Sequence, residues 1–197
     1  MKQSKKQLGL LAAATLIALP LGFTAVQADS YKIDETHAHA AFSVTHLGFS
    51  TTYGQFKTIE GTFEFDEAAP EKSTVDVTIQ TNSVDTANDA RDEHVRGADF
   101  FDVEKFPTMT FKSTGVEVTG ENTGNLTGDL TLLGVTKPVT LAVTFNKAGP
   151  HPFKKEITVA GFNATGELDR TDFGMNYASP MIGNTIPLII SVEGIKQ

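Results

Sequence analysis

The amino-acid sequence predicts an all-β protein in which about eight antiparallel strands form a sandwich or a barrel, with one short helix after the middle strands. Apolar and polar residues alternate through most of the chain, which is the pattern of strands with one buried face. Breaker-rich segments of hairpin length separate these runs. One charged stretch, RDEHVRGADFFDVEKFP at residues 91–107, interrupts the alternation and contains the helix candidate.

The first residues have the character of a targeting segment. Three lysines precede an apolar run over residues 8–23, and small residues follow at positions of the cleavage type. The run is too short and too poorly flanked to be a membrane span. We therefore predict a secretory signal peptide over residues 1–28 that is removed before Asp29, a single domain over residues 29–197, and a periplasmic location.

Composition excludes several classes of function. Without the three leader lysines, 13 of the 16 basic residues remain against 24 acidic ones, which gives a net charge of −11. Such a charge repels nucleic acid and anionic lipid headgroups, so no nucleic-acid partner is expected. The chain has no cysteine, which excludes thiol catalysis, cysteine-type metal sites and disulfides.

The strands follow one another with a period of two, and alternate residues in each run are predicted to face inward. Antiparallel strands with one apolar face must hide it in a sandwich or by closing into a barrel. The inward positions, in chain order, are Phe42, Val44 and His46; Ile59, Gly61, Phe63 and Phe65; Val75, Val77 and Ile79; Met109 and Phe111; Leu126, Gly128, Leu130 and Leu132; Val139, Leu141, Val143 and Phe145; Phe162, Ala164, Gly166 and Leu168; and Ile186, Leu188, Ile190 and Val192.

The helix is predicted from Ala87 to about Arg96. Thr86 with Asp89 three residues later matches a capping box, and Asp92 and Arg96 have the spacing of an ion pair within a helix. Gly97 then ends the helix, and the proline at position 107 prevents helical structure beyond it.

Three phenylalanines, Phe100, Phe101 and Phe106, lie on the return from the helix. They must be buried against or inside the sheet. Two roles are open for them: they line or plug the mouth of a ligand cavity, or they close one end of the domain as ordinary core.

Histidines and acids provide weak candidates for chemistry. His37 and His39 share one face of a strand, as zinc ligands would, but no third ligand is identifiable and we predict no metal site. His46 lies in an apolar row, which is typical of a hydrogen-bonded core histidine. His94 lies among Asp92, Glu93 and Asp99, and an ion pair from Arg91 that docks the helix is favoured there over catalysis.

Glycines at three inward positions leave two interpretations open. Gly61, Gly128 and Gly166 all occur among large apolar neighbours. Glycine inside a strand marks either a bend of the barrel wall or space that is kept open for a ligand.

Four segments in a fixed order carry a family resemblance: YKIDETHAHAAFSVTHLGFSTTYGQF, SVDTANDARDEHVRGADFFDVEKFPTMTF, GNLTGDLTLLGVTKPVTL and GFNATGELDRTDFGMNY. Together they span almost the whole chain after the leader. On these residues the sequence resembles the YceI-like family of exported polyisoprenoid-binding proteins. The resemblance implies a lipocalin-like antiparallel β-barrel of about eight strands. Its apolar interior would hold a long isoprenoid chain, with the helix against one opening and no catalytic residue set.

The expected partner is therefore a long-chain isoprenoid lipid, an isoprenoid diphosphate or an isoprenoid quinone, with transient membrane contact and no cofactor. The expected ligand-binding residues are Phe42, Val44, His46, Phe56, Gly61, Phe63, Ile79, Phe100, Phe101, Phe106, Phe111, Gly128, Leu130, Phe162, Phe173 and Met175. A diphosphate would need a cation, for which Arg91, Arg96, Lys137 and Arg170 are the candidates. Two alternatives stay open: a small-molecule hydrolase or isomerase that uses His46 or His94, and a structural or inhibitory exported barrel.

Overall fold

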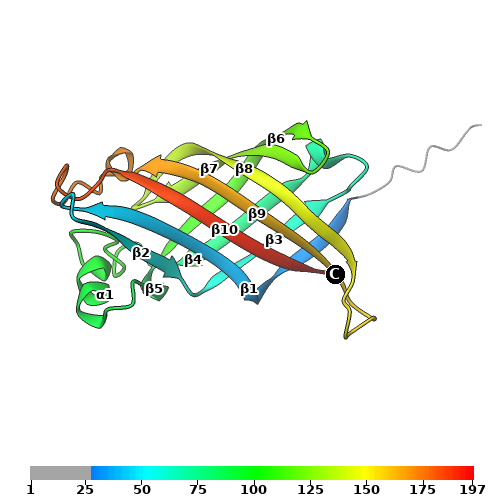
Figure 1. Cartoon of the computed structure of the whole chain (residues 1–197), viewed down its shortest axis with the longest axis horizontal. Helices are drawn as coiled ribbons and strands as arrows, with labels where there is room; N and C mark the ends of the chain where they lie inside the picture. The colour runs from blue at the N-terminus through cyan, green and yellow to red at the C-terminus, as the bar shows by residue number, and fades with distance from the viewer. Residues whose placement is uncertain (1–27) are drawn as a thin grey trace, which may run out of the picture.

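A computed structural model describes residues 28–197, so the predicted signal peptide lies almost entirely outside the described residues. The strands are β1 (Asp29–His46), β2 (Ser50–Phe56), β3 (Ile59–Phe65), β4 (Thr74–Gln80), β5 (Val84–Asp85), β6 (Thr108–Gly120), β7 (Thr123–Leu132), β8 (Val135–Pro150), β9 (Thr158–Asp169) and β10 (Thr185–Lys196). The helix α1 spans Asp89–Arg96, and three short 3₁₀ turns cover Pro70–Lys72, Thr81–Ser83 and Arg170–Phe173. Figure 1 shows the strands wound around an elongated interior, with α1 at one end and the C-terminus at the other.

Eight of the strands close into a barrel, which confirms the predicted fold class. Every neighbouring pair is antiparallel, in the order β10, β9, β8, β7, β6, β4, β3 and β1, and β10 pairs with β1 to complete the circle. Closure removes the free sheet edges that an open sheet of this size would present.

β1 is long enough to take two partners along one edge. Residues 29–32 pair with β3, and residues 40–46 pair with β2. β2 in turn pairs with the short β5. These two strands therefore extend the wall at the end of the barrel where α1 lies (Figure 1). Among the described residues, no helix is long and apolar enough to cross a membrane.

The predicted alternation is confirmed along the strands, because their apolar positions are buried or half-buried and face inward. Aromatic rings line the end of the barrel farther from α1. Tyr31 stacks on Phe63 at 4.9 Å between ring centroids, and Phe65 packs on Phe145 at 4.9 Å and on Phe162 at 5.0 Å. Ring packing of this kind stabilises the core beyond the effect of the area that it buries.

The helix is confirmed, but its predicted start is wrong. Ala87 has φ 60°, a left-handed conformation that lies outside the helix. The N-cap is Asn88, whose side-chain oxygen accepts a hydrogen bond from the Arg91 backbone N–H at 3.0 Å. Thr86 is drawn away from capping because its hydroxyl donates to the buried carboxylate of Asp92 at 2.5 Å.

The predicted ion pairs of the helix are also absent from the described residues. Asp92 accepts from the backbone and side chain of Thr86 and forms no pair with Arg96. Arg96 donates to the carbonyl oxygens of Asn82 at 2.9 Å and Val84 at 2.8 Å, while Arg91 donates to Thr86 rather than to an acid. The arginines therefore dock α1 on the chain next to β5 through backbone carbonyls, which only the folded chain brings within reach.

Candidate functional site

The interior of the barrel holds a cavity of about 420 Å³. That volume falls within the range of roughly 300–1,000 Å³ that is usual for small-molecule sites. Its wall consists mostly of the inward side chains of the strands, and it reaches Val95, Phe100 and Ile182 at the α1 end and the β6–β7 turn at the far end. The cavity therefore runs along the barrel and suits a long, apolar ligand.

Twelve of the 20 proposed ligand-binding and headgroup residues border this cavity. They are Phe42, Val44, Phe56, Phe63, Ile79, Phe100, Phe101, Phe111, Leu130, Phe162 and Met175 among the proposed ligand contacts, and Arg170 among the proposed cations. Two of the three phenylalanines after α1 are in this set. Phe101 meets Phe56 edge to face at 5.3 Å, and Phe100 meets Tyr177 at 5.3 Å. The return from the helix thus forms part of the cavity wall at the α1 end.

The other eight proposed ligand-binding and headgroup residues do not border the cavity. The interpretation of His46 as a core histidine is wrong, because β1 has passed the end of the barrel at that point and the side chain is exposed. Phe106 packs over Gly134 and Phe173 is buried in the core without bordering the cavity. Lys137 is exposed on the outer surface, and Arg91 and Arg96 are engaged in docking α1.

The inward glycines do not keep space open for a ligand. A Cβ atom on Gly128 would lie 2.7 Å from the Lys112 carbonyl oxygen and would overlap the Phe111 ring. A Cβ on Gly61 would collide with the Asp76 carbonyl, and one on Gly166 would lie 2.7 Å from a Leu141 methyl carbon. The reading of these glycines as a hollow is therefore wrong: they allow close approach of a neighbouring strand or ring.

Several residues of the cavity wall are not predicted by the sequence. Val95 borders the cavity from α1, and Ile182 does so from the loop before β10. Other wall residues are predicted by the period-two alternation of the strands. Val77, Leu141 and Ile190 are at predicted inward positions, and all three line the cavity. Val95 and Ile182 lacked such a signal, because helix docking and loop closure depend on tertiary contacts.

Arg170 is the one arginine or lysine among the residues that line the cavity, which also include His39. It is only 3% exposed, and no acidic group pairs with it in the described residues. Its guanidinium donates to the carbonyl oxygens of Met175 at 2.6 Å, Ile182 at 2.9 Å and Gly183 at 2.9 Å. Burial lowers the pKa of Arg170, but the group stays charged at neutral pH. A positive charge therefore lies at the α1 end of an apolar cavity.

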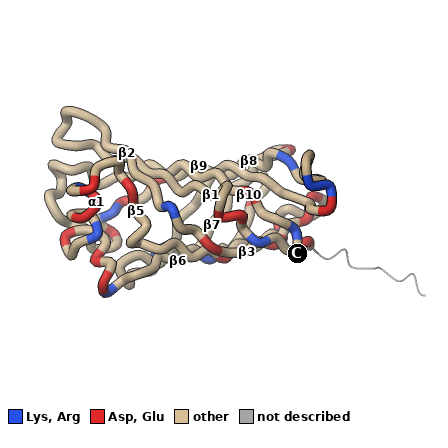
Figure 2. The backbone as a smooth tube through the Cα atoms, turned by 90° about the horizontal axis from the view of Figure 1, so that it is seen from below, with Lys and Arg blue, Asp and Glu red and all other residues tan. Residues whose placement is uncertain are grey.

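The opposite end of the cavity is acidic. Glu64, Glu67 and Glu121 border it there. Figure 2 shows charged residues of both signs gathered at this end of the barrel, near the C-terminus. Among the residues that border the cavity, the arginine therefore lies at the α1 end and the three glutamates lie at the far end.

His94 lies on the outer side of the α1 end. Its Nε2 is 3.2 Å from an Asp99 carboxylate oxygen, and its ring packs on Phe100 at 5.1 Å and on Tyr177 at 5.5 Å. The side chain is about half exposed and does not border the cavity. Its ring forms an aromatic contact between α1 and the loop before β10.

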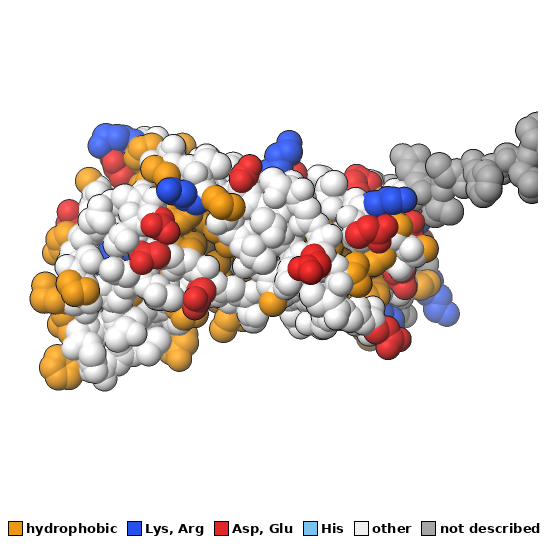
Figure 3. Space-filling model, turned by 90° about the horizontal axis from the view of Figure 1, so that it is seen from above, with side chains coloured by type: hydrophobic (Ala, Val, Ile, Leu, Met, Phe, Trp, Pro, Cys, Tyr) orange, Lys and Arg blue, Asp and Glu red, His pale blue; other side chains and the backbone are white. Residues whose placement is uncertain are grey.

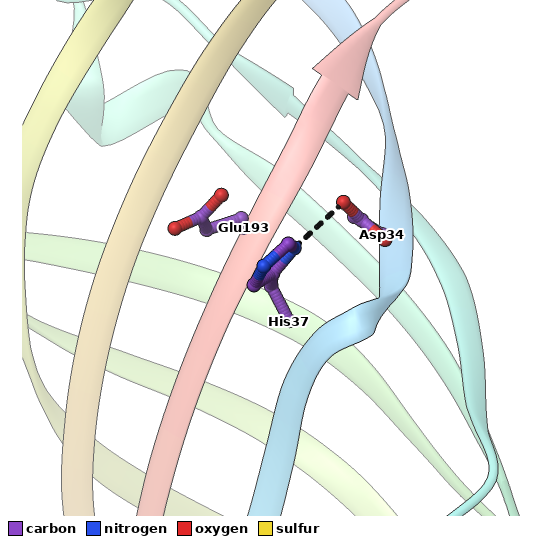
Figure 4. Close-up of side chains that lie close together, drawn as sticks. All are labelled: Asp34, His37 and Glu193. Atoms are coloured by element: carbon purple, nitrogen blue, oxygen red, sulfur yellow. Dashed lines mark hydrogen bonds and ion pairs between the residues drawn. The ribbon is translucent and has the colours of Figure 1, made fainter. Parts of the chain in front are cut away.

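A second group of polar side chains arises at a bulge in β1. Ile33 pairs with Gly194 and Ala38 pairs with Val192, so residues 34–37 lie opposite Glu193 alone. Figure 4 shows Asp34 and His37 of this bulge next to Glu193 on β10. His37 Nδ1 is 3.0 Å from Asp34 Oδ2, and Thr36 donates to Asp34 Oδ1 from both its backbone and its hydroxyl. His39, the expected partner of His37, is not part of the group.

A bound metal ion is not required to explain why these side chains lie together. Both carboxylate oxygens of Asp34 already accept hydrogen bonds. These bonds, with His37 first and Thr36 next, lower the pKa of Asp34 to about 2. The pKa of His37 is raised, first by its hydrogen bond with Asp34 and then by the charges of Asp34 and Glu193. The cluster is satisfied as a hydrogen-bonded ion pair that fixes the bulge.

We expect Asp34→Asn to lower the thermal midpoint by roughly 1–3 °C between pH 4.5 and 6, a small effect because His37 is more than half exposed and screened by solvent. Because folding lowers the pKa of Asp34, its carboxylate stabilises the fold at pH values above the pKa that it has in the unfolded chain. This stabilisation is lost as the pH falls from about 4 toward 2. Because folding raises the pKa of His37, its protonated ring stabilises the fold at pH values below the pKa that it has in the unfolded chain. This stabilisation is lost as the pH rises through the pKa of the folded state. Thermal unfolding from pH 2 to pH 9 checks this, and a pH-independent deficit would contradict it.

Comparisons with known proteins agree with the fold. The family model of the YceI-like domain matches residues 31–194. A UPF0312 protein of Ectopseudomonas mendocina (strain ymp) is 47% identical over 189 residues, which are 95% of this chain and 97% of that protein. The Campylobacter jejuni YCEI protein structure is 28% identical with a TM-score of 0.70, over 93% of this chain and 99% of the other.

A more distant structure has a stated ligand class. A polyisoprenoid binding domain from Saccharophagus degradans, implicated in plant cell wall breakdown, is 16% identical with a TM-score of 0.64. The match covers 85% of this chain and 98% of that domain. At this level of identity the likeness concerns the barrel itself, which both chains form.

Proposed function

Because this chain belongs to the YceI-like domain family, we propose that it is an exported, periplasmic binding or carrier protein that holds a long-chain polyisoprenoid lipid in its barrel. The observation that carries the proposal is the apolar cavity of about 420 Å³ that extends between the two ends of the barrel. The polyisoprenoid-binding domain that shares this fold supports the ligand class.

The energetics favour a carrier over an enzyme. Burial of each methylene group contributes about 0.8 kcal/mol relative to water, but a bilayer gives the same chain nearly equal shelter. A protein that takes lipid from a membrane therefore gains little net hydrophobic free energy, and its selectivity comes from chain shape and headgroup contacts. The proposed catalytic histidines, His46 and His94, do not border the cavity, so the hydrolase alternative has no support from their placement.

The lipid is proposed to bind with its headgroup at the α1 end. Arg170 offers N–H donors there, since only three of its five are used by the carbonyls of the loop. A diphosphate or a quinone carbonyl would both accept from it. No lysine or arginine borders the far end of the cavity, so the tail is proposed to occupy that part.

The test is the lipid content of protein purified from an exporting host. We expect organic extraction and mass spectrometry to recover an isoprenoid lipid, and intact mass to show a chain that begins at Asp29. Phe101→Asp should reduce the recovered lipid about tenfold or more, because it places a carboxylate in the apolar wall beside Phe56. The lipid is normalised to folded protein, measured by circular dichroism.

Phe153→Asp is the matched control, because Phe153 is 91% exposed and lies outside the cavity. The control should retain lipid at the level of the parent. Recovery of no isoprenoid from the parent would argue against the proposed ligand, and unchanged recovery from a folded Phe101→Asp variant would argue against the cavity as its site.

A further inference from the structure

After the predicted leader, two long segments of the chain carry no lysine, arginine, aspartate or glutamate: residues 36–56 and residues 173–192. In a chain with 20% charged residues, about four would be expected in each. The first segment contains the turn between β1 and β2, and the second contains the loop that leads into β10. Charge is therefore missing from two connections, where polar and charged residues are normally common.

The two connections lie together at the α1 end of the barrel. The Leu47 backbone N–H donates to the Met181 carbonyl at 3.0 Å, and the Gly183 N–H donates to the Thr45 carbonyl at 2.9 Å. In Figure 1 both connections extend beyond the strands at the left, and the loops at the upper left of Figure 2 carry no charged residue. They form one continuous uncharged projection.

The projection exposes large apolar side chains, which we call the apolar rim: Leu47, Phe49, Tyr177 and Met181. Their exposed fractions are 45%, 87%, 44% and 63%. Six of the eight exposed large hydrophobic residues in the described part of the chain belong to the two uncharged segments. Figure 3 shows apolar side chains gathered at this end of the molecule. Single exposed apolar residues are ordinary, but a gathered set marks an interaction surface.

The apolar rim is continuous with the cavity. Ile182 follows Met181 and borders the cavity, and Tyr177 packs on Phe100, which also borders it. The carbonyl of Ile182 accepts from Arg170, the cation at this end of the cavity. A surface that touches the rim therefore lies next to the proposed position of the lipid headgroup.

We propose that the apolar rim docks this protein on the surface of a lipid bilayer, and that isoprenoid enters and leaves the cavity there. The proposal rests on the proposed lipid-binding function. A bilayer fits the rim because aromatic and aliphatic side chains partition into the interface while charged ones resist it. The negative net charge disfavours anionic headgroups, so the fitting surface is zwitterionic.

The absence of tryptophan from the chain allows a direct measurement. Phe49→Trp places a single reporter on the rim, and Phe153→Trp places one on the β8–β9 loop at the opposite end, beside two lysines. With vesicles of phosphatidylcholine, Phe49→Trp emission should shift to shorter wavelength and be quenched by brominated acyl chains. An interfacial side chain lies about 5–10 Å into the boundary, within reach of that quencher. Phe153→Trp emission should not change.

A double variant, Phe49→Asp with Met181→Asp, should weaken sedimentation with the same vesicles about tenfold or more. Phe153→Asp, the control for charge, should sediment like the parent. Both variants replace exposed residues, so folding should be retained. Lipid that the double variant takes up from detergent micelles should match the parent, because the cavity is unchanged.

Three outcomes would overturn the docking proposal: Phe49→Trp emission that vesicles leave unchanged, a shift confined to Phe153→Trp, or a shift without vesicles that grows with protein concentration, which points to a second copy of the chain. In each of these cases lipid recovered by extraction still supports the proposed function. A parent that yields no isoprenoid refutes that function even if the rim binds vesicles.

Discussion

Replacement of Gly128 by leucine is expected to destabilise the barrel by about 3 kcal/mol, at the upper end of the usual cost of overpacking, and to lower its thermal midpoint by roughly 6–12 °C. The first side-chain carbon would lie 2.7 Å from the Lys112 carbonyl oxygen and would overlap the edge of the Phe111 ring. The carbonyl belongs to the paired strand β6 and cannot move without loss of the ladder hydrogen bonds between β6 and β7. Thermal unfolding of lipid-free protein measures the effect.

Gly115→Leu is the matched control, because it lies on β6 with nothing within 4 Å of its Cβ position. Its midpoint should stay within about 2 °C of the parent, as expected for an exposed substitution away from packed neighbours. A Gly128→Leu variant that stays as stable as the parent while it loses lipid would restore the interpretation that Gly128 keeps space open for a ligand, which the surroundings of this glycine contradict.

The second large effect is expected at Arg170. Arg170→Met should cost about 3 kcal/mol and lower the midpoint by roughly 6–12 °C, because three backbone carbonyls lose a charged donor together. These carbonyls belong to Met175, Ile182 and Gly183, so the loop before β10 should also lose hydrogen-exchange protection. The guanidinium holds both ends of that loop at once, from a position that is only 3% exposed.

Arg170→Lys separates charge from geometry. Lysine keeps the positive charge but lacks the planar fork that reaches three carbonyls, so it should recover less than half of the lost stability. Lys137→Met, at an exposed position, should leave the midpoint unchanged. An Arg170→Met variant with parental stability and exchange would show that the loop is held by other contacts.

How far the sequence predicts the site depends on the kind of residue. Phe42, Phe63 and Leu130 were predicted to face inward because period-two alternation places a side chain on one face of a strand whatever its partners are. These three residues border the cavity. His46 follows the same alternation but is exposed, because alternation contains no information about where the barrel ends. Gly128 was misjudged because the neighbour that lies over it, Phe111, comes from another strand.

The local chemistry of the chain determined the all-β class, the approximate number of strands, the presence of the helix and its end near Gly97, and the inward face of each strand. These depend on neighbours within a few residues, which the sequence contains directly. Tertiary structure alone decided strand register, and register placed Glu193 opposite the bulge that carries Asp34 and His37. It also decided which cation borders the cavity. Arg170 is held there by hydrogen bonds to the loop before β10, and no motif around it in the sequence predicts this position. Such contacts join residues that are distant along the chain, and their free energy exists only once the barrel has closed.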